Sequence, residues 1–191
     1  VTRIREGNAP YLANIVEVGH GSVLEHAILN FIFADVSRVV THELVRHRAG
    51  TAISQESLRF VRLDSLSAYV PVHIREHEQG MDLFVRTFEE LGRIQQELAE
   101  LYAIDDEKLF AVKKKLTSAF RRMAPIGVAT TIGWSCNFRT LRHVIEMRTD
   151  PHAEEEIRFL FGKVYHLVKE RYPNLFADYE ETEADGLPWI K

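Results

Sequence analysis

The spacing of apolar side chains along the chain predicts helices that alternate with short strands. Leu12, Ile15 and Val16 recur at helical intervals behind Pro10, a residue that suits the first turn of a helix. The same periodicity is most extended between residues 76 and 103, where one long amphipathic helix is expected. The other helices are expected over residues 37–48, from Asp105 or Asp106 to before Pro125, over 137–147 and over 150–172.

Strands are predicted over residues 28–33, which are apolar and partly aromatic, over 58–61, where apolar and basic residues alternate, and over 128–132, which are β-branched. Four of the expected helices begin behind a residue able to accept a backbone N–H, namely Ser37, Asp105 or Asp106, Asn137 and Asp150. Ser22 and Glu25 have the spacing of a capping box. These elements predict an α+β fold, a single domain over residues 1–191 with a central, mostly antiparallel sheet surrounded by helices, one of them long.

Composition narrows the class of protein. Apolar residues make up 46% of the chain and charged residues 27%, which is typical of a globular domain. Cys136 is the only cysteine, so no disulfide can form within the chain. No signal peptide opens the sequence, and no apolar run approaches the roughly 20 residues that cross a bilayer. We therefore expect a soluble protein of the cytoplasm, without a membrane partner.

The net charge of −4 disfavours nucleic acid as the main partner. The charge is uneven, however, because only Glu43 and Glu56 oppose a local excess of basic residues. These basic residues are Arg38, Arg46, Arg48, Arg59 and Arg62. Such an excess favours a small anionic ligand, and a solvated charged face is the alternative.

The most informative segment joins an expected helix end to a polar loop. Arg46-His47-Arg48 offers planar donor groups that suit phosphate. Gln55, Glu56 and Ser57 add the donors and acceptors that read the polar edge of a nucleobase. Taken alone, Arg-His-Arg is weak evidence, and surface arginines beside a polar turn are the simpler interpretation.

Two further clusters carry candidate chemistry. The segment from His20 to His26 contains two histidines and a glutamate, but His20 precedes the expected cap and shares no regular helical face with His26, so no metal site is predicted. In the second cluster Asn137 would place Arg139 in the first turn of a helix, where backbone amides favour an anion. The same cluster also holds Arg121, His143, Arg148 and His152.

Together these segments resemble the flavin-dependent thymidylate synthases, also called thymidylate synthase complementing proteins. That family has a His-x-(Ser/Thr)-x-x-Glu-His segment, an Arg-His-Arg signature followed by Ser-x-Arg-Tyr, Arg-x-x-x-Pro, Asn-x-Arg, and Leu-Arg with a histidine four residues later. The matching residues here, in the same order between residues 15 and 161, are His20/Ser22/Glu25/His26, Arg46-His47-Arg48, Ser57-Leu58-Arg59-Phe60, Arg121 with Pro125, Asn137 with Arg139, and Met147-Arg148 with His152. A single tripeptide arises easily by chance, whereas six ordered elements do not.

The resemblance implies a homotetramer whose active sites are built where subunits meet. It implies that FAD is bound by His20, Ser22, Arg46, His47, Arg48, Asn137, Arg139, His143 and His152, with His20 and His152 near the flavin. It implies that the nucleotide dUMP is bound by Glu43, Arg46, Gln55, Glu56, Ser57, Arg59, Arg121 and Arg148. Arg148 is the expected catalytic residue, because a fixed cation beside the pyrimidine lowers the cost of negative charge on the ring.

The family's reaction takes a methylene group from methylenetetrahydrofolate, and reduced FAD supplies the hydride. NADPH then re-reduces the flavin. The redox step belongs to the cofactor, so no cysteine nucleophile is required. Cys136 is consistent with a reaction that needs no cysteine nucleophile, because it has no neighbouring histidine and precedes the expected helix.

The chain departs from the family pattern in four ways. Eight residues, rather than seven, separate Arg48 from Ser57. Phe60 replaces the usual tyrosine, and Glu43 stands where a glutamine can contact the nucleotide, so its carboxylate is expected to weaken phosphate binding. The family's N-terminal strand is expected before Val1. The main alternative is a non-catalytic homologue that binds flavin or nucleotide, and a helical nucleic-acid-binding module is a second.

Overall fold

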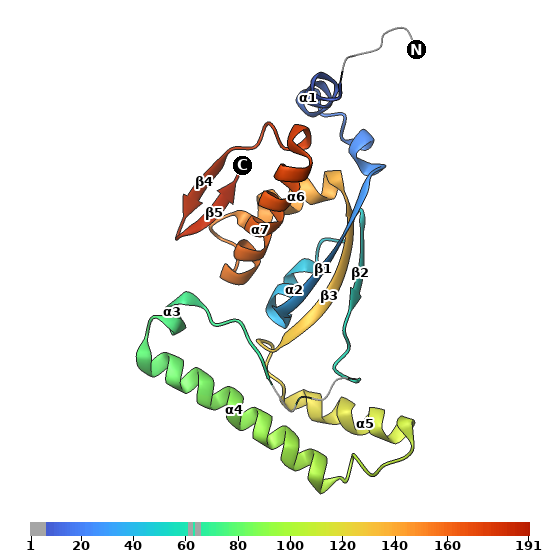
Figure 1. The fold of residues 1–191 in the computed structure, drawn as a ribbon, viewed down its shortest axis with the longest axis vertical. Coiled ribbons are helices and arrows are strands. Elements are labelled where there is room, and N and C mark those ends of the chain that lie inside the picture. The colour runs from blue at the N-terminus through green and yellow to red at the C-terminus, as the bar shows by residue number, and fades with distance from the viewer. Residues whose placement is uncertain (1–6, 61–62, 64–65) are drawn as a thin grey trace. The chain divides into compact units, whose positions relative to one another are not determined.

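The computed structural model describes residues 7–60, 63 and 66–191, which form an α+β fold (Figure 1). Its α-helices are α1 (Ala9–Glu17), α2 (Arg38–Leu44), α3 (Val72–Arg75), α4 (Glu78–Leu101), α5 (Phe110–Phe120), α6 (Phe138–Thr149) and α7 (Glu155–Arg171), and its 3₁₀ turns are η1 (Gly21–Glu25), η2 (Arg121–Met123) and η3 (Pro173–Leu175). Its strands are β1 (Ile28–Ser37), β2 (Thr51–Gln55), β3 (Ala129–Asn137), β4 (Glu181–Ala184) and β5 (Leu187–Ile190). One sheet has the order β1-β3-β2, and β4 pairs with β5 in an antiparallel hairpin. The expected fold class and long helix are confirmed.

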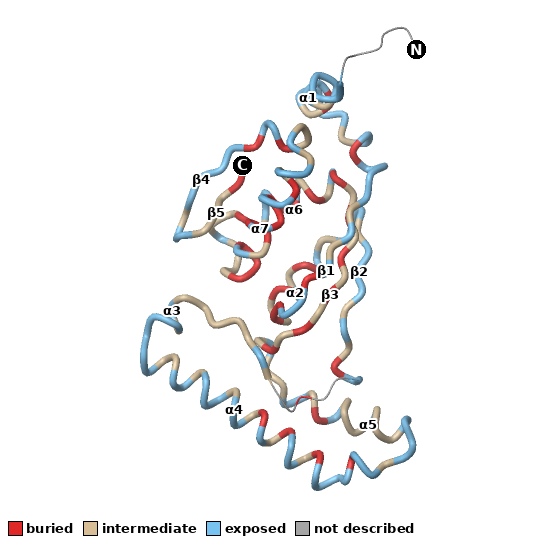
Figure 2. Tube along the Cα trace, viewed as in Figure 1, coloured by how far each residue is buried: buried red, intermediate tan, exposed pale blue. Residues whose placement is uncertain are grey.

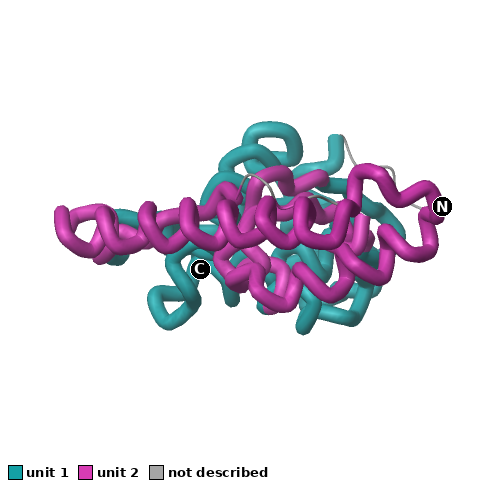
Figure 3. Tube along the Cα trace, turned by 90° about the horizontal axis from the view of Figure 1, so that it is seen from below, with its two compact units in different colours: residues 1–31, 43–53, 134–191 teal, residues 32–42, 54–133 magenta. Residues whose placement is uncertain are grey.

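Contacts divide the chain into two compact units (Figure 3). Unit 1 comprises residues 1–31, 43–53 and 134–191, and unit 2 comprises residues 32–42 and 54–133. Strands β1, β2 and β3 each contribute residues to both units. The single domain expected from the sequence stays a prediction.

The core of unit 1 is built on the buried faces of α6 and α7 (Figure 2). The ring of Trp134 packs edge-on against Phe161, with ring centroids 5.6 Å apart. Other buried members are Phe138, Leu141, Val144, Ile145, Ile157, Val164, Tyr165, Val168, Phe176 and Ile190. The hairpin β4–β5 closes this core, because the Ile190 N–H donates to the buried Thr149 hydroxyl at 3.0 Å. Side chains buried on this scale supply most of the free energy that fixes α6 in place.

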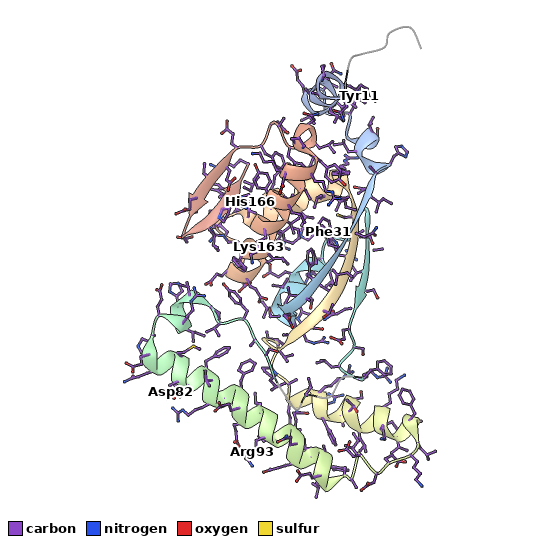
Figure 4. The ribbon with its side chains drawn as sticks, viewed as in Figure 1. Tyr11, Phe31, Asp82, Arg93, Lys163 and His166 are labelled. Atoms are coloured by element: carbon purple, nitrogen blue, oxygen red, sulfur yellow. The ribbon has the colours of Figure 1, made fainter. Side chains whose placement is uncertain are left out.

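Unit 2 contains the long helix α4, which buries a narrow stripe of small and polar residues (Figure 2). Ala99 packs with Ile104 and Phe120, and the Gln95 amide donates to the Phe120 carbonyl at 3.2 Å. Asp82 and Arg93 lie on the exposed side (Figure 4). None of the helices in the described part of the chain is long and apolar enough to cross a bilayer.

Several expected helix starts are confirmed. Pro10 lies in the first turn of α1, the Ser37 hydroxyl accepts the Val40 N–H at 3.2 Å, and the Asn137 side chain caps α6. The expected cap at Asp150 is wrong, because its carboxylate accepts the His152 N–H and α7 begins only at Glu155 behind the cap Glu154. Local side-chain bonds of this kind compete with helix initiation.

Other boundaries also differ from the expectation. Helix α2 ends at Leu44 rather than near Arg48, and α5 starts at Phe110 without a side-chain cap from Asp105 or Asp106. Ser22 makes no capping bond, because residues 21–25 form a 3₁₀ turn. The strand expected over residues 58–61 is a turn at 58–60, and the strand lies at 51–55 instead. Val61 and Arg62 lie outside the described residues.

Candidate active site

The loop after α2 is attached to the first turn of α6. The Asn137 N–H donates to the Gly50 carbonyl at 3.0 Å, and the Thr140 hydroxyl donates to the Ala49 carbonyl at 2.8 Å. Gly50 has a φ of +69°, and a Cβ there would lie 2.4 Å from both Asn137 Nδ2 and Thr140 Oγ1. Only glycine fits this position without displacing the cap. The attachment fixes Arg46-His47-Arg48 beside the N-terminus of α6.

This junction lines an open cavity of about 750 Å³ in unit 1. Six residues that the family resemblance assigns to flavin binding line it: Arg46, His47, Arg48, Asn137, Arg139 and His143. Three of the six are arginines, and the backbone amides at the start of the 12-residue helix α6 add further positive potential. The cavity therefore suits an anionic, phosphate-bearing ligand.

Arg139 is oriented by contacts from the η1 segment. Its guanidinium donates to the Glu25 carboxylate at 2.5 Å. A Cβ at Gly21 would lie 3.0 Å from Arg139 Nε, so the small residue lets the chain pass close to the arginine. Glu25 was not assigned to the site from the sequence, although it belongs to the His20–His26 segment that indicated one.

Three of the expected flavin residues do not line the cavity. His20 and Ser22 are exposed and flank Gly21, beside Arg139. The His152 side chain is 96% exposed, and its ring lies 2.8 Å from the Asp150 carboxylate. The structure therefore gathers six of the nine residues and leaves these three around or outside the cavity.

Arg148, near the end of α6, contacts Glu43 in the last turn of α2 and His47 in the loop that follows it. Its Nε donates to His47 Nε2 at 2.8 Å, its Nη1 to the Glu43 carboxylate at 2.7 Å, and its Nη2 to the Glu43 carbonyl at 3.3 Å. The Arg148 and Glu43 side chains are only 17% and 29% exposed, so the pair is shielded from water. The charge of Glu43 is thereby matched by Arg148.

His47 is held as a neutral imidazole. Burial, and then electrostatic interactions with Arg148 and His143, lower its pKa from 6.5 to about 4. Because Nε2 accepts the Arg148 hydrogen, the ring hydrogen resides on Nδ1. The ring of His143 packs edge-on at 6.3 Å between centroids.

The lowered pKa of His47 predicts a loss of stability in acid. An unfolded histidine titrates near 6.5, whereas His47 stays neutral in the folded protein until about pH 4. Between these values the unfolded state binds the extra proton, so the free energy of unfolding should fall as the pH is lowered from 6.5 to 4. Because the side chain is partly exposed, we expect a contribution of roughly 1–2 kcal/mol, less than the full linkage value.

Urea unfolding of the cofactor-free protein between about pH 7.5 and 4.5 measures this loss. The His47→Gln variant should lose less stability over the range, since glutamine does not titrate and still offers an acceptor to Arg148. His73→Gln changes an exposed histidine of α3 and should behave as the wild type. Equal acid sensitivity of the wild type and His47→Gln would contradict a neutral His47.

The expected nucleotide residues at the end of β2 and directly after it lie in unit 2. The Gln55 amide donates to the Thr41 hydroxyl at 3.2 Å, and the Glu56 N–H donates to the Thr131 carbonyl at 2.9 Å. The Ser57 hydroxyl accepts the Arg59 N–H at 3.4 Å within the turn. These bonds fix the backbone of the segment, while the Arg59 side chain is exposed.

Arg38 is a further candidate that was not assigned to the site from the sequence. Burial lowers its pKa, the positive charge of Arg121 lowers it further, and Glu56 opposes the effect. Its Nη2 donates to the Glu56 carbonyl at 3.2 Å, while its Nε is buried without a partner among the described residues. Two mutually repelling cations favour a bound anion. The sequence signal was the position of Arg38 at the start of the basic segment.

Cys136 is unsuited to nucleophilic catalysis. Its side chain is 1% exposed on β3, and burial raises the pKa of the thiol to about 12. At neutral pH it is therefore a protonated thiol and not a nucleophilic thiolate. This agrees with chemistry that does not use an enzyme cysteine.

Comparisons with known proteins point to one family. The family model described as thymidylate synthase complementing protein matches residues 2–174. The flavin-dependent thymidylate synthase of Corynebacterium glutamicum is 37% identical over 188 residues, which cover 94% of this chain and 73% of the relative. The protein of that name from Mycobacterium tuberculosis is 36% identical over 189 residues, with the same coverage.

A solved structure supports the fold. Thymidylate Synthase X (ThyX) from Helicobacter pylori, crystallised with FAD and dUMP, superposes with a TM-score of 0.63 at 21% sequence identity. The superposition covers 91% of this chain and 85% of the other. On the match of residues 2–174 and the identity to these relatives, the chain belongs to the thymidylate synthase complementing protein family, the flavin-dependent thymidylate synthases.

Proposed function

We propose that this protein is a flavin-dependent thymidylate synthase, a methyltransferase that converts dUMP into dTMP. Methylenetetrahydrofolate is the one-carbon donor, and NADPH reduces the flavin. The observation that carries the proposal is the convergence of six expected flavin residues on one cavity at the start of α6, in a chain of this family. The family membership supplies the reaction, and the cavity supplies a place for its cofactor.

The chemistry of the cavity fits FAD. Arg46, Arg48 and Arg139 offer cationic donors to a pyrophosphate, and the α6 amides add positive potential. Asn137 and His143 add polar groups, and His20, Ser22 and His152 are assigned to the flavin by resemblance alone. When bound, FAD supplies the hydride that turns the transferred methylene into a methyl group. The residues of the chain bind and orient it.

For the nucleotide, we propose that Arg59, Arg121 and Ser57 hold the phosphate and sugar. The electrostatic repulsion between Arg38 and Arg121 supports the binding of an anion beside them in unit 2. Gln55, Glu56 and Arg46 are assigned to dUMP by resemblance, whereas the Glu43 carboxylate, for which the resemblance implies the same contact, is paired with Arg148. Arg148 would lie against the pyrimidine, where its charge stabilises negative charge that develops on the ring.

The proposed assembly is a homotetramer with active sites built where subunits meet. This follows from the resemblance to the family. In this arrangement, one chain contributes the flavin-binding residues of a site and another chain contributes its nucleotide-binding residues.

The test is an absorbance experiment on purified protein titrated with FAD. The bound flavin is reduced anaerobically, and dUMP and methylenetetrahydrofolate are then added. We expect flavin reoxidation together with stoichiometric dTMP, detected by chromatography. Tight FAD binding without dTMP would favour the non-catalytic homologue, and no FAD binding would overturn the proposal.

A further inference from the structure

The hydrogen bonds of Arg148 use some of its guanidinium N–H groups and leave others available. A guanidinium carries five N–H groups. Three of them are used: Nε–H on the His47 ring, one Nη1–H on the Glu43 carboxylate and one Nη2–H on the Glu43 carbonyl. Among the described residues, no partner is found for the remaining two, one on each terminal nitrogen.

We propose that Glu43 and His47 are positioning residues that hold Arg148 so that its two remaining N–H groups form a fixed pair directed at the pyrimidine of the nucleotide. This rests on the proposed function, in which Arg148 contacts the ring. It gives Glu43 a role through Arg148 in place of the nucleotide contact expected from the sequence. It also gives His47 a role beyond the flavin cavity.

The two positioning residues are themselves well anchored. Glu43 lies in the last turn of α2, and its carbonyl also accepts the Arg46 N–H at 3.2 Å. The His47 N–H donates to the Leu44 carbonyl at 3.1 Å, and the His47 carbonyl accepts the Thr51 hydroxyl at 2.8 Å. An arginine held by groups of this kind loses less side-chain freedom when it binds an anion.

The charge of Glu43 has a second consequence. A carboxylate 2.7 Å from the guanidinium keeps Arg148 in place but also offsets part of its positive charge. A glutamine at this position would keep an oxygen acceptor and remove the offset. An alanine would remove the attachment and leave Arg148 free to swing away from the ring. The two substitutions therefore separate positioning from charge.

The test follows the ionisation of a substrate analogue, without turnover. The probe is 5-fluoro-2′-deoxyuridine monophosphate bound to the FAD-loaded protein, and its ¹⁹F NMR shift is titrated against pH to give the pKa of the bound ring. We expect Arg148→Ala to raise this pKa by about 1–2 units, and Glu43→Ala by about 1 unit. Glu43→Gln should keep it within about 0.3 unit of the wild type, or lower it.

Non-additivity is the decisive readout. If Glu43 acts through Arg148, the double variant Glu43→Ala/Arg148→Ala should show the same ring pKa as Arg148→Ala alone. Additive shifts would overturn the proposal, since they would mean that Glu43 acts on the nucleotide independently. A wild-type protein that does not bind the analogue would instead defeat the proposed function, so the two failures are distinguishable.

Asp178→Ala is the matched control. The Asp178 carboxylate accepts hydrogen bonds of 2.6 and 2.9 Å from the guanidinium of Arg142, which lies on the same helix as Arg148. This pair does not include Arg148 or its partners. This variant should lose stability comparably and leave the ring pKa unchanged. If Glu43→Ala does not fold, Glu43→Asp replaces it, because its carboxylate is withdrawn by one methylene. A wild-type ring pKa in Glu43→Asp or Glu43→Ala would contradict the proposal.

Discussion

Replacing Arg148 with alanine should lower the single-turnover rate of dTMP formation by about 10²–10³-fold, the size typical of losing one preorganised donor for developing charge. The affinity for FAD should change by less than about threefold, because Arg148 does not itself line the cavity assigned to the flavin and reaches it only through His47. Rapid-quench measurement of dTMP and a titration of flavin absorbance check the two quantities separately.

Arg139→Ala provides the opposite pattern. Arg139 lines the cavity and is held by Glu25, so its loss should weaken FAD binding by about tenfold or more. With FAD at saturation, the rate of methyl transfer should recover to a greater extent than in Arg148→Ala. Equal loss of FAD affinity in both variants would mean that their assigned roles are wrong.

Gly50→Ala should lower the free energy of unfolding by about 2–4 kcal/mol and impair FAD binding together with it. Part of the loss comes from the φ of +69°, and the larger part from a Cβ placed 2.4 Å from Asn137 Nδ2 and Thr140 Oγ1. Relief of that overlap displaces either the Asn137 and Thr140 side chains or the loop, and both movements disturb the attachment that holds Arg46-His47-Arg48 beside α6. Urea unfolding and FAD titration measure both effects.

Gly186→Ala isolates the backbone contribution. Gly186 has a φ of +73° in the β4–β5 turn, and a Cβ there would meet nothing within 4 Å. We expect a loss of only about 1 kcal/mol and unchanged FAD binding. If the Gly50 and Gly186 variants lost the same stability, the close approach of the loop to α6 would be of no energetic importance.

Features that depend on neighbours in the sequence were the most predictable. Asn137 was predicted as a helix cap because it follows a strand and precedes an apolar helical pattern, and its side chain does accept the Thr140 N–H at 2.9 Å. The turn at residues 58–60 was mistaken for a strand, because alternating apolar and basic residues suit both. Leu58 is buried there, while Arg59 and Phe60 are exposed.

Features that depend on distant partners were beyond local patterns. Glu43 and Arg148 are 105 residues apart, so no spacing rule pairs them, and the carboxylate was expected to weaken phosphate binding. The hairpin β4–β5 was missed for a different reason. Its Asp185-Gly186 turn is a recognisable signal, but its strands of four residues are too short to show an alternating pattern.

The C-terminal hairpin also sets a practical limit on where the chain can be shortened or extended. An expression boundary placed directly after α7 would remove Ile190, the donor to the Thr149 hydroxyl, and Pro188, which lies 3.2 Å from a Cβ built at Gly162. It would also remove Asp185 and leave the buried Arg158 without that carboxylate. Because Thr149 follows Arg148 directly, truncation would loosen the end of the helix that carries the proposed catalytic arginine.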